Sequence, residues 1–385
     1  MTIVVTGGGS GGHITPILAV AHELKRLDPT TRVIYIGQRG DALADIPAQD
    51  PSIDEVYLVR AGKFRRYHGE GWRQLLDLPT VYKNLRDLGY IVIGTAQSWR
   101  LMRELRPDII FTRGGFVSVP VALGGLLNRV PYITHDSDST PSLANRLIAR
   151  WARRHAVALP EDFYPYPRQK TITVGVPVSN DYQPVKVPLL AQYRQEIGLT
   201  AAQQLVLVTG GGNGSQALNE AIIANAGYLL QRHPNLVLVH IAGRALAAGV
   251  SAAYDEQLDK MQRRRVIVKG FIGNLYRYSA VADVVVARGG ATNLAEFAIQ
   301  AKACVIIPSP QLIWNVKNTD ALAARQAVIK LDQDQAEQDG RLAAVIGELL
   351  NSDAKRTKLE QALASFARPD AAERLAKLLL EEAAK

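Results

Sequence analysis

The sequence predicts an α/β protein with two doubly wound domains, each a parallel sheet covered by helices on both faces. Three observations predict this class. The chain has 385 residues, which is too long for one ordinary hydrophobic core. Short apolar runs alternate with helical patterns along the chain. A glycine-rich string occurs twice, as TGGGSGGH at residues 6–13 and as TGGGNGSQ at residues 209–216.

The apolar runs are continuous in Val, Ile and Leu, which is typical of parallel strands buried on both faces. We expect such strands at 2–6, 32–37, 108–112, 132–135, 204–210, 236–243, 265–270, 283–288 and 303–308. Each glycine-rich string follows the first strand of its half of the chain and precedes a helix. In the first half, Thr15 can cap that helix and Pro16 can take its first position.

A proline-rich string without helical or strand periodicity, VGVPVSNDYQPVKVPLL at 174–190, marks the boundary between the two domains. We therefore expect an N-terminal domain over residues 1–175 and a C-terminal domain over residues 176–367.

The last segment, 368–385, has the pattern of an amphipathic helix. Asp370 and Glu373 are placed for a capping box at its start. We expect this helix to pack back toward the N-terminal domain.

The composition excludes several classes of protein. Hydrophobic residues make up 47% of the chain and charged residues 21%, as in soluble globular proteins. No run of 18 apolar residues occurs, so no membrane-spanning helix is expected. The first residues, MTIVVTGGG, lack the basic region and cleavage site of a signal peptide. The single cysteine, Cys304, lies in the apolar run ACVIIP and is expected to be a buried strand residue in a reducing cytosol.

The net charge of +9 is compatible with anionic lipid, nucleic acid or a phosphorylated substrate as partner. Nucleic acid is the least favoured, because no recognised binding module occurs. Basic residues interleave with apolar ones over residues 63–86, which fits either peripheral contact with an anionic membrane or a helix with a core face and a solvated basic face. The residues are Lys63, Phe64, Arg65, Arg66, Trp72, Arg73, Leu75, Leu76, Leu78, Val81, Tyr82, Lys83 and Arg86.

Glycines at a turn from strand to helix let the backbone approach a ligand and expose N–H groups at the positive end of a helix, which together attract phosphate. The first string matches G-x-G-x-x-G as Gly7, Gly9 and Gly12. A dinucleotide fold would also need an acidic residue at the end of the second strand, where IGQRG offers none. A P-loop is excluded because His13 stands where lysine would be.

His13 stands at the end of the first glycine-rich string, just ahead of a helix. A neutral imidazole there can act as general base for a hydroxyl, and the positive end of the helix favours the neutral form. The alternative is a histidine that only hydrogen-bonds the loop.

Two more loops follow predicted strands, TRGGFVS at 112–118 and ARGGATNLAE at 287–296. The second of these opens a helix near Thr292 and is another candidate for binding a diphosphate. Glu296 lies in the first turn or so of that helix. Its carboxylate can accept hydrogen bonds from both hydroxyls of a ribose, or it can simply stabilise the helix N-terminus.

Taken together and in order, these strings resemble the MurG family. The matching strings are GGSGGHITPILAVAHEL (8–24), GGFVSVP (114–120), THDSD (134–138), VTGGGNGSQALN (208–219), GFI (270–272) and ADVVVARGGATNLAEFA (282–298). The resemblance covers most of the chain, and the ordered set is far more specific than any one loop.

The resemblance implies a GT-B fold, in which two Rossmann-like domains face a central cleft. It implies an inverting transferase that moves GlcNAc from UDP-GlcNAc to undecaprenyl-diphospho-MurNAc-pentapeptide, the step from lipid I to lipid II in peptidoglycan synthesis. The expected partners are the UDP-sugar donor, the lipid-diphosphate acceptor and the inner face of the cell membrane, with the protein cytoplasmic and peripheral. No cofactor is expected, and no metal is required in principle, because helix dipoles and backbone N–H groups would stabilise the leaving diphosphate.

The resemblance also implies roles for single residues. His13 would be the catalytic base. The acceptor would be bound by Ser10, Gly11, Gly12, Gly114, Gly115, Ser118, His135 and Asp138. The donor would be bound by Gly211, Gly212, Asn213, Gly214, Ile272, Ala291, Thr292, Glu296 and Asn315, with the uracil at Ile272 and the ribose at Glu296.

Five positions depart from the family pattern. Ser179 replaces an arginine after the domain boundary, Gly212 replaces a serine of the second glycine loop, and Asp138 replaces an asparagine. Trp314 and Asn315 stand where the family has two adjacent glutamines that contact the sugar. The identity of the donor sugar is therefore open from the sequence.

Three alternatives to the lipid-linked GlcNAc transferase remain at this point. The first is a related transferase with another UDP-sugar or another lipid acceptor. The second is a UDP-GlcNAc 2-epimerase, which would not need the N-terminal glycine–histidine loop. The third is a nucleotide-binding protein without catalysis, which the presence of His13 disfavours.

Overall fold

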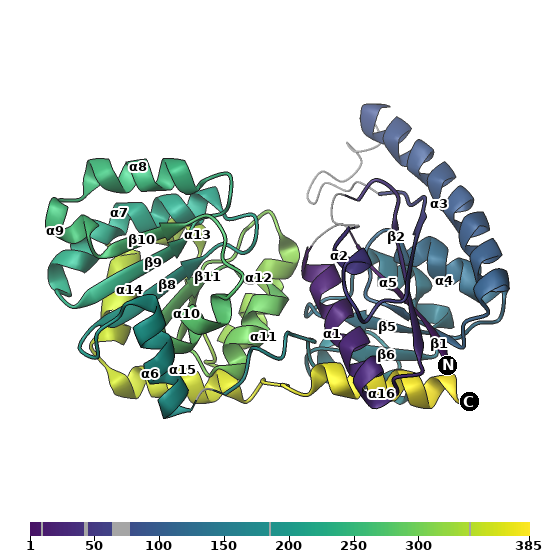
Figure 1. Cartoon of the computed structure of the whole chain (residues 1–385). Coiled ribbons are helices and arrows are strands. Elements are labelled where there is room, and N and C mark those ends of the chain that lie inside the picture. Colours follow the sequence, from purple (N-terminus) through teal and green to yellow (C-terminus); the bar gives the residue numbers. More distant parts are fainter. Residues whose placement is uncertain (9–10, 42–44, 64–77, 185, 339) are drawn as a thin grey trace. The chain divides into compact units, whose positions relative to one another are not determined.

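The structure is a computed structural model that describes residues 1–8, 11–41, 45–63, 78–184, 186–338 and 340–385 (Figure 1). For residues 11–13 and 78–81 only the backbone is described. The described chain forms two compact units. Unit 1 consists of Met1–Ser179 with Asp370–Lys385, and unit 2 consists of Asn180–Pro369.

Unit 1 contains a 7-stranded sheet in the order β3-β2-β1-β4-β5-β6-β7, and every neighbouring pair is parallel. The strands are β1 (Thr2–Thr6), β2 (Arg32–Gln38), β3 (Glu55–Val59), β4 (Ile109–Thr112), β5 (Tyr132–Asp136), β6 (Arg154–Val157) and β7 (Thr171–Thr173). The helices are α1 (Gly11–Leu27), α2 (Asp45–Ala48), α3 (Leu78–Leu105), α4 (Ser118–Leu127), α5 (Leu143–Ile148) and α16 (Ala371–Ala383).

Two apolar layers cover the sheet of unit 1. On one face, β1 residues such as Ile3 and Val5 pack against Ile17 of α1 and against Leu375 of α16. On the other face, Ile110 of β4 packs among buried residues of α3 and α4. The continuous apolar runs of β1 and β4 are buried on both faces, as parallel strands between helices require.

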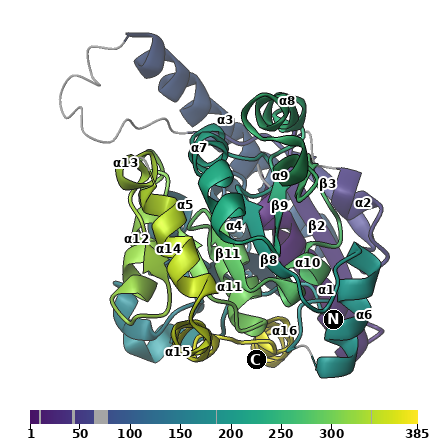
Figure 2. The ribbon, with the colours of Figure 1, turned by 90° about the vertical axis from the view of Figure 1, so that its left-hand side faces the viewer.

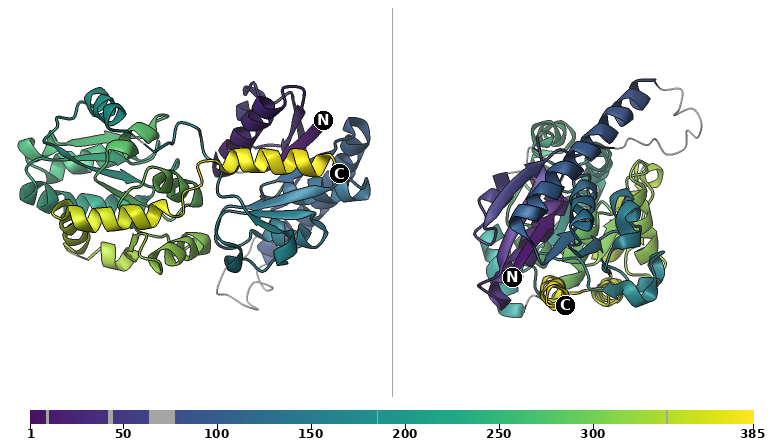
Figure 3. Two further views of the ribbon diagram at one scale, coloured as in Figure 1. Left: turned by 90° about the horizontal axis from the view of Figure 1, so that it is seen from below. Right: turned by 90° about the vertical axis from the view of Figure 1, so that its right-hand side faces the viewer.

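The C-terminal helix α16 belongs to unit 1, where it lies beside α1 (Figure 3, left). Glu382, buried near its end, pairs with Arg153 and Arg154 at 2.8 and 3.1 Å. The expected capping box is wrong, because Asp370 makes no side-chain cap hydrogen bond. Its carboxylate instead accepts from Arg374 Nε at 2.6 Å, since that guanidinium lies one turn along the same face.

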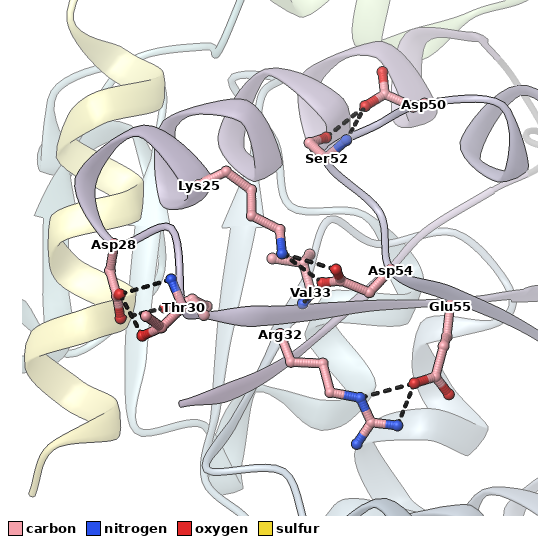
Figure 4. A network of polar contacts seen from close by, with 10 residues as sticks. Lys25, Asp28, Thr30, Arg32, Val33, Asp50, Ser52, Asp54 and Glu55 are labelled. Atoms are coloured by element: carbon pink, nitrogen blue, oxygen red, sulfur yellow. Dashed lines mark hydrogen bonds and ion pairs between the residues drawn. The ribbon is translucent and has the colours of Figure 1, made fainter.

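The edge of unit 1 formed by α1, β2 and β3 is held by polar contacts (Figure 4). Asp54, just before β3, accepts hydrogen bonds from Lys25 Nζ on α1 at 2.7 and 2.8 Å and from the Val33 N–H at 2.6 Å. Arg32 on β2 pairs with Glu55 on β3. These contacts fix the end of α1 to the sheet edge.

Unit 2 contains a 6-stranded sheet in the order β10-β9-β8-β11-β12-β13, again with every neighbouring pair parallel. The strands are β8 (Gln204–Thr209), β9 (Leu236–Ile241), β10 (Val266–Lys269), β11 (Val284–Ala287), β12 (Cys304–Ile306) and β13 (Ile329–Lys330). The helices are α6 (Val187–Ile197), α7 (Gln216–Arg232), α8 (Ala247–Gln257), α9 (Lys260–Arg263), α10 (Leu275–Val281), α11 (Ala291–Ile299), α12 (Ile313–Ala323), α13 (Gln333–Ala336), α14 (Arg341–Leu350) and α15 (Asp353–Ala364).

The sheet of unit 2 also has two apolar layers. Val206 of β8 packs with Leu218 of α7 on one face, and Leu207 packs with Phe297 of α11 on the other. Cys304 is fully buried in β12, and this burial raises the pKa of its thiol. The two all-parallel sheets confirm the expected α/β doubly wound class.

Helix α3 is the most prominent projection of unit 1 (Figure 2; Figure 3, right). Its inner side packs against the segment before it, where a Cβ added at Gly62 would lie 1.9 Å from the Asp87 carbonyl oxygen. Its outer side is apolar and exposed at Tyr82, Leu85 and Val92. No helix among the described residues combines the length and apolar character needed to cross a bilayer.

Candidate functional site

Each sheet has a switch point, which is a pair of adjacent strands from which the strand order runs outward in opposite directions. In unit 1 this position lies between β1 and β4, and in unit 2 between β8 and β11. Ligands of doubly wound folds bind outside the carboxyl ends of the strands at such a point. Both glycine-rich strings, which follow β1 and β8, lie there.

In unit 1 the loop after β1 packs closely on the loop after β4. A Cβ added at Gly115 would lie 3.0 Å from the Gly8 carbonyl oxygen, and the Gly7 carbonyl accepts a hydrogen bond from Tyr35. Gly114 and Gly115 have φ values of +82° and +84°, a region that side chains rarely adopt. The buried Ser118 donates to the Gly114 carbonyl at 2.6 Å and so holds the second loop in place.

Helix α1 begins at Gly11, so Pro16 lies inside it and does not open it, contrary to the sequence-based expectation. The run Gly11–His13 has helical backbone, which places His13 in the first turn at the positive end of the helix dipole. Ser10 lies outside the described residues, and so do the side chains of residues 11–13.

His135, at the end of β5, is fully buried and hydrogen-bonded on both ring nitrogens. Its Nε2–H donates to the Gly175 carbonyl at 2.9 Å, and its Nδ1 accepts from Arg113 Nη1 at 3.1 Å. Burial, with the charge of Arg113, lowers the pKa of His135 to about 3. The imidazole is therefore neutral, with its proton on Nε2.

Arg113 and Asp136 lie beside this histidine and were not singled out from the sequence. Burial lowers the pKa of Arg113 to about 10, a shift that Asp138 and Asp136 oppose, so the guanidinium stays charged at neutral pH. Asp136 accepts from the Ser142 N–H at 3.0 Å, from Asn145 Nδ2 at 2.9 Å and from the Tyr166 hydroxyl at 2.7 Å.

Asp138 is partly buried, and its backbone carbonyl accepts from the Tyr164 hydroxyl at 3.0 Å. The structure thus brings Gly114, Gly115, Ser118, His135 and Asp138 together around the carboxyl ends of β4 and β5.

In unit 2 the glycine-rich loop presents an open backbone. Gly211 and Gly214 have φ values of +83° and +74°. The Gly214 N–H donates to the Gly211 carbonyl at 3.0 Å, which closes the turn. A Cβ added at Gly211 or Gly212 would meet no atom of the described chain within 4 Å. Asn213, between them and Gly214, is exposed. This side of the loop is therefore accessible to a ligand.

Arg288 joins this loop to the loop after β11. Its Nε and Nη2 donate to Ser215 Oγ at 2.9 and 2.6 Å, and its Nη1 donates to the Ile307 carbonyl at 2.9 Å. Because Arg288 is 8% exposed, these hydrogen bonds form in a largely buried setting, where they are strong. The sequence signal for it was the string Arg-Gly-Gly, which occurs at 113–115 and again at 288–290.

Helix α11 starts at Ala291, directly after Gly290, and Ala291 and Thr292 are partly exposed. Their N–H groups lie at the positive end of a helix of 9 residues, where an anion is stabilised. Arg288, just before 291–292, is thus tied to Ser215, just after 211–214.

Glu296 lies further along α11 and is partly buried. Burial raises the pKa of its carboxyl to about 8, and a hydrogen bond with the Tyr182 hydroxyl opposes that rise. Tyr182, in the segment before α6, was not singled out from the sequence, and nothing in its local pattern would have identified it.

The start of α12 packs on the loop after β11. A Cβ added at Gly289 would lie 2.4 Å from the Asn315 carbonyl oxygen, and Asn318 Nδ2 donates to the Gly289 carbonyl at 3.1 Å. Asn315 is 5% exposed, and its side-chain oxygen has no hydrogen-bond partner among the described residues. Trp314 beside it is 42% exposed. Ile272, after β10, is partly buried against the apolar layer of α11.

Comparison with known proteins gives matches over both units. Residues 3–157 match the model of the glycosyltransferase family 28 N-terminal domain, and residues 205–375 match that of the glycosyltransferase family 28 C-terminal domain. A relative from Moorella thermoacetica, named UDP-N-acetylglucosamine--N-acetylmuramyl-(pentapeptide) pyrophosphoryl-undecaprenol N-acetylglucosamine transferase, is 31% identical over 389 residues, which span 99% of each chain.

Solved structures show the same fold. MurG of Acinetobacter baumannii superposes with a TM-score of 0.75 at 21% identity, over 99% of both chains. A UDP-GlcNAc 2-epimerase from Neisseria meningitidis, bound to UDP-GlcNAc, superposes with a TM-score of 0.65 at 13% identity, over 99% of this chain and 100% of that one. Similarity at these identities shows the GT-B fold, which transferases and epimerases share.

Proposed function

We propose that this chain, which belongs to glycosyltransferase family 28 and within it to the MurG family, transfers N-acetylglucosamine from UDP-GlcNAc to undecaprenyl-diphospho-MurNAc-pentapeptide. The observation that carries the proposal is the match to a transferase of that activity at 31% identity over 99% of both chains. The glycine loops at the switch points of both sheets support it.

The donor site lies in unit 2. The open backbone of Gly211, Gly212, Asn213 and Gly214 and the N–H groups of Ala291 and Thr292 bind the diphosphate. Glu296 accepts hydrogen bonds from the ribose hydroxyls, the backbone at Ile272 pairs with the uracil, and Asn315 contacts the sugar. The buried, unpartnered oxygen of Asn315 supports this last role, because a sugar hydroxyl could supply its missing hydrogen bond.

The acceptor site lies in unit 1. The backbones of Gly11 and Gly12, at the start of α1, hold the acceptor diphosphate together with Ser10, which lies outside the described residues, and His13 takes the proton of the attacking hydroxyl. Gly114 and Gly115 line the pocket, with Ser118 holding their loop. His135 is fully buried, so it acts by fixing Arg113 and the Gly175 carbonyl, while the partly exposed Asp138 faces the acceptor.

The reaction is a single displacement. The acceptor oxygen forms a bond to the anomeric carbon as the bond from that carbon to the β-phosphate oxygen breaks, so the configuration inverts. The proton of the hydroxyl passes to His13 and the negative charge to UDP. The N–H groups around Ala291 and the glycine loop stabilise that charge as it develops.

The acceptor's lipid chain requires a membrane, and the exposed outer side of α3 is the proposed contact. Tyr82, Leu85 and Val92 are 69%, 64% and 64% exposed, and the exposed bases Lys83 and Arg86 lie among them. Such a surface binds anionic lipid by apolar insertion and charge. Residues 64–77, which carry most of the basic and apolar residues noted from the sequence, lie outside the described residues.

The activity is tested by UDP release with a short-chain analogue of the lipid-linked muramoyl pentapeptide and with UDP-GlcNAc, UDP-GalNAc or UDP-glucose as donor. We expect release with UDP-GlcNAc, and a fall in kcat of about 10²–10⁴-fold in His13→Ala. His22→Ala, on the exposed side of the same helix, is the matched control and retains activity. UDP release that needs no acceptor would indicate a hydrolase, whereas conversion of UDP-GlcNAc to another UDP-sugar without net release of UDP would indicate an epimerase. A preference for another donor would instead implicate Trp314 and Asn315.

The membrane contact is tested separately by flotation with vesicles that contain anionic lipid. Leu88, 48% exposed, belongs to the same outer side of α3 as Leu85. The double variant Leu85→Glu/Leu88→Glu should bind at least about tenfold more weakly than the parent. Met261→Glu, at an exposed position of unit 2, should bind as the parent does. Equal binding of the double variant and the parent would contradict the proposed contact.

A further inference from the structure

A cavity of about 470 Å³ lies in unit 1 at the amino ends of β4 and β5. The ends of α3 and α4 and the segments that lead into the two strands form its wall. Three arginines, Arg103, Arg106 and Arg129, and one carboxylate, Asp108, are among the lining residues. The loops of the candidate acceptor site follow the carboxyl ends of the same strands. Since β4 has 4 residues, about 13 Å of strand separates the two places.

Two of these arginines end helices in a conformation that usually belongs to glycine. Arg106, directly after α3, has a φ of +46°, and Arg129, shortly after α4, has a φ of +61°. The Arg106 N–H donates to the Met102 carbonyl and the Arg129 N–H to the Leu126 carbonyl, both at 3.0 Å, as at ordinary left-handed helix ends. Any side chain is strained in this region, so ending the helix does not itself call for arginine.

The third arginine and the wall behind it are held in place by printed contacts between α3 and α4. The Arg103 guanidinium carbon lies 5.0 Å from the centre of the Trp99 ring, a cation–π arrangement. Asn128 Nδ2 donates to the Trp99 carbonyl at 3.1 Å and to the Gly124 carbonyl at 2.8 Å. These bonds join the ends of the two helices, so the cavity is formed before any ligand enters, as is usual for small-molecule sites.

The charges of the lining favour an anion. Three guanidinium groups outnumber one carboxylate, and the Asp108 carboxylate already accepts from the Thr2 N–H at 2.7 Å. Within the part of the chain that the structure describes, Arg103, Arg106 and Arg129 form no ion pair and their side chains donate no hydrogen bond. Strained residues gather where function requires them, and two of the four described non-glycine residues with positive φ line this cavity.

We propose that this cavity binds the phosphate group of an organic phosphate through Arg103, Arg106 and Arg129. Guanidinium forks match phosphate oxygens, and a phosphomonoester offers three of them, enough for three arginines to share. The volume of about 470 Å³ lies in the range of small-molecule sites, so the ligand carries more than the phosphate itself. The phosphate belongs to a soluble compound or to a lipid headgroup. This site is additional to the donor and acceptor sites, and the proposal does not depend on the reaction.

The first test is calorimetric binding of glycerol 3-phosphate to the parent and to Arg106→Gly/Arg129→Gly. An ionic strength of about 0.15 M screens unspecific attraction between exposed charges. Glycine removes both guanidinium groups and suits the positive φ at both positions. We expect at least about tenfold weaker binding, a melting temperature at or above that of the parent, and UDP release in the transferase assay within about twofold of the parent.

The matched control is Arg150→Gln/Arg168→Gln, which removes two exposed arginines of unit 1 that do not line the cavity. It should bind glycerol 3-phosphate as the parent does. Equal losses in the control and in Arg106→Gly/Arg129→Gly would overturn the proposal, because binding would then follow net charge alone. A lower melting temperature with unchanged binding would also overturn it, since the arginines would then only stabilise the helix ends.

A second arm identifies the source of the phosphate by flotation with vesicles that contain phosphatidic acid, whose headgroup is a phosphomonoester. Glycerol 3-phosphate binding that is lost in Arg106→Gly/Arg129→Gly supports a site for a soluble phosphate. Vesicle binding that is weaker in this variant than in the control, by a parent that does not bind glycerol 3-phosphate, supports a site for a headgroup. A parent that shows neither kind of arginine-dependent binding would refute the site and leave the proposed transferase function untouched.

Discussion

The two units carry the same tripeptide, Arg-Gly-Gly, directly after the strand that neighbours the first strand of each sheet. In unit 1, Arg113 points to the buried His135, and Gly114 and Gly115 are both left-handed. In unit 2, Arg288 reaches the glycine loop through Ser215, and Gly290 has a φ of −77° and begins a helix.

The difference teaches that the tripeptide does not determine its own conformation. In unit 1 two residues separate it from α4, and Arg113 is surrounded by a histidine and carboxylates. In unit 2 helix α11 begins at once, and Arg288 finds its partners in a neighbouring loop. One copy builds a closed polar core, and the other connects two loops whose backbone is open to a ligand.

The largest effect should come from removing the two arginines. Arg113→Met should lower the free energy of unfolding by about 3 kcal/mol, because the acidic groups around it lose a buried partner. It should also raise the pKa of His135 above its value of about 3, since Arg113 is one of the causes that lower it. Arg288→Met should cost about 1–2 kcal/mol and weaken UDP binding. Urea denaturation measures the free energy of unfolding, NMR titration the pKa of His135, and calorimetry the binding of UDP. Equal losses of stability in the two variants would contradict the proposed difference between the two arginines.

A second pair of variants tests the glycines. Gly115→Ala should destabilise the protein by about 1–3 kcal/mol, because its φ is +84° and the new Cβ would lie 3.0 Å from the Gly8 carbonyl oxygen. Gly290→Ala should change stability by less than about 0.5 kcal/mol, since its φ is −77° and no described atom lies within 4 Å of the new Cβ. Similar melting temperatures for the two variants would refute the assigned conformations.

The smallest effect concerns two carboxyls, those of the partly buried Glu296 and the buried Asp136. Burial raises the pKa of Glu296 from 4.5 to about 8, so the folded state holds the proton more tightly than the unfolded state. Stability is therefore full below about pH 4.5 and declines as the pH rises toward 8. Glu296→Gln should remove that decline and be about 1–2 kcal/mol more stable than the parent at pH 8.5. Melting curves across this range measure it, and parallel profiles would contradict the shifted pKa.

Asp136 is the counterpart of Glu296 in unit 1. Its carboxylate has three hydrogen-bond donors, Ser142, Asn145 and Tyr166, where Glu296 has Tyr182. Asp136→Asn should therefore destabilise at every pH, because an amide cannot accept from all three. The opposite signs expected for the two variants sharpen the comparison.

The strands show which elements of the fold the apolar pattern of the sequence can predict and which it cannot. Runs such as 2–6 and 283–288 were predicted because strands buried on both faces are continuously apolar. The edge strands Glu55–Val59, Thr171–Thr173 and Ile329–Lys330 were not predicted, and neither was Arg154–Val157, which lies next to an edge. They are partly exposed and contain polar residues, so their pattern does not differ from that of a loop. Pairing with a neighbouring strand makes them β structure.

The sequence by itself determined the α/β class, the repeated glycine loops and their place after the first strand of each half. These are local properties, since glycine dihedral freedom and the apolar period of a strand are carried by adjacent residues. Only the tertiary structure decided which side chains interact around the loops: Arg113 with His135, Arg288 with Ser215, and Tyr182 with Glu296. Burial and hydrogen-bond partners depend on residues far apart in the chain, and only the folded sheets bring those residues together.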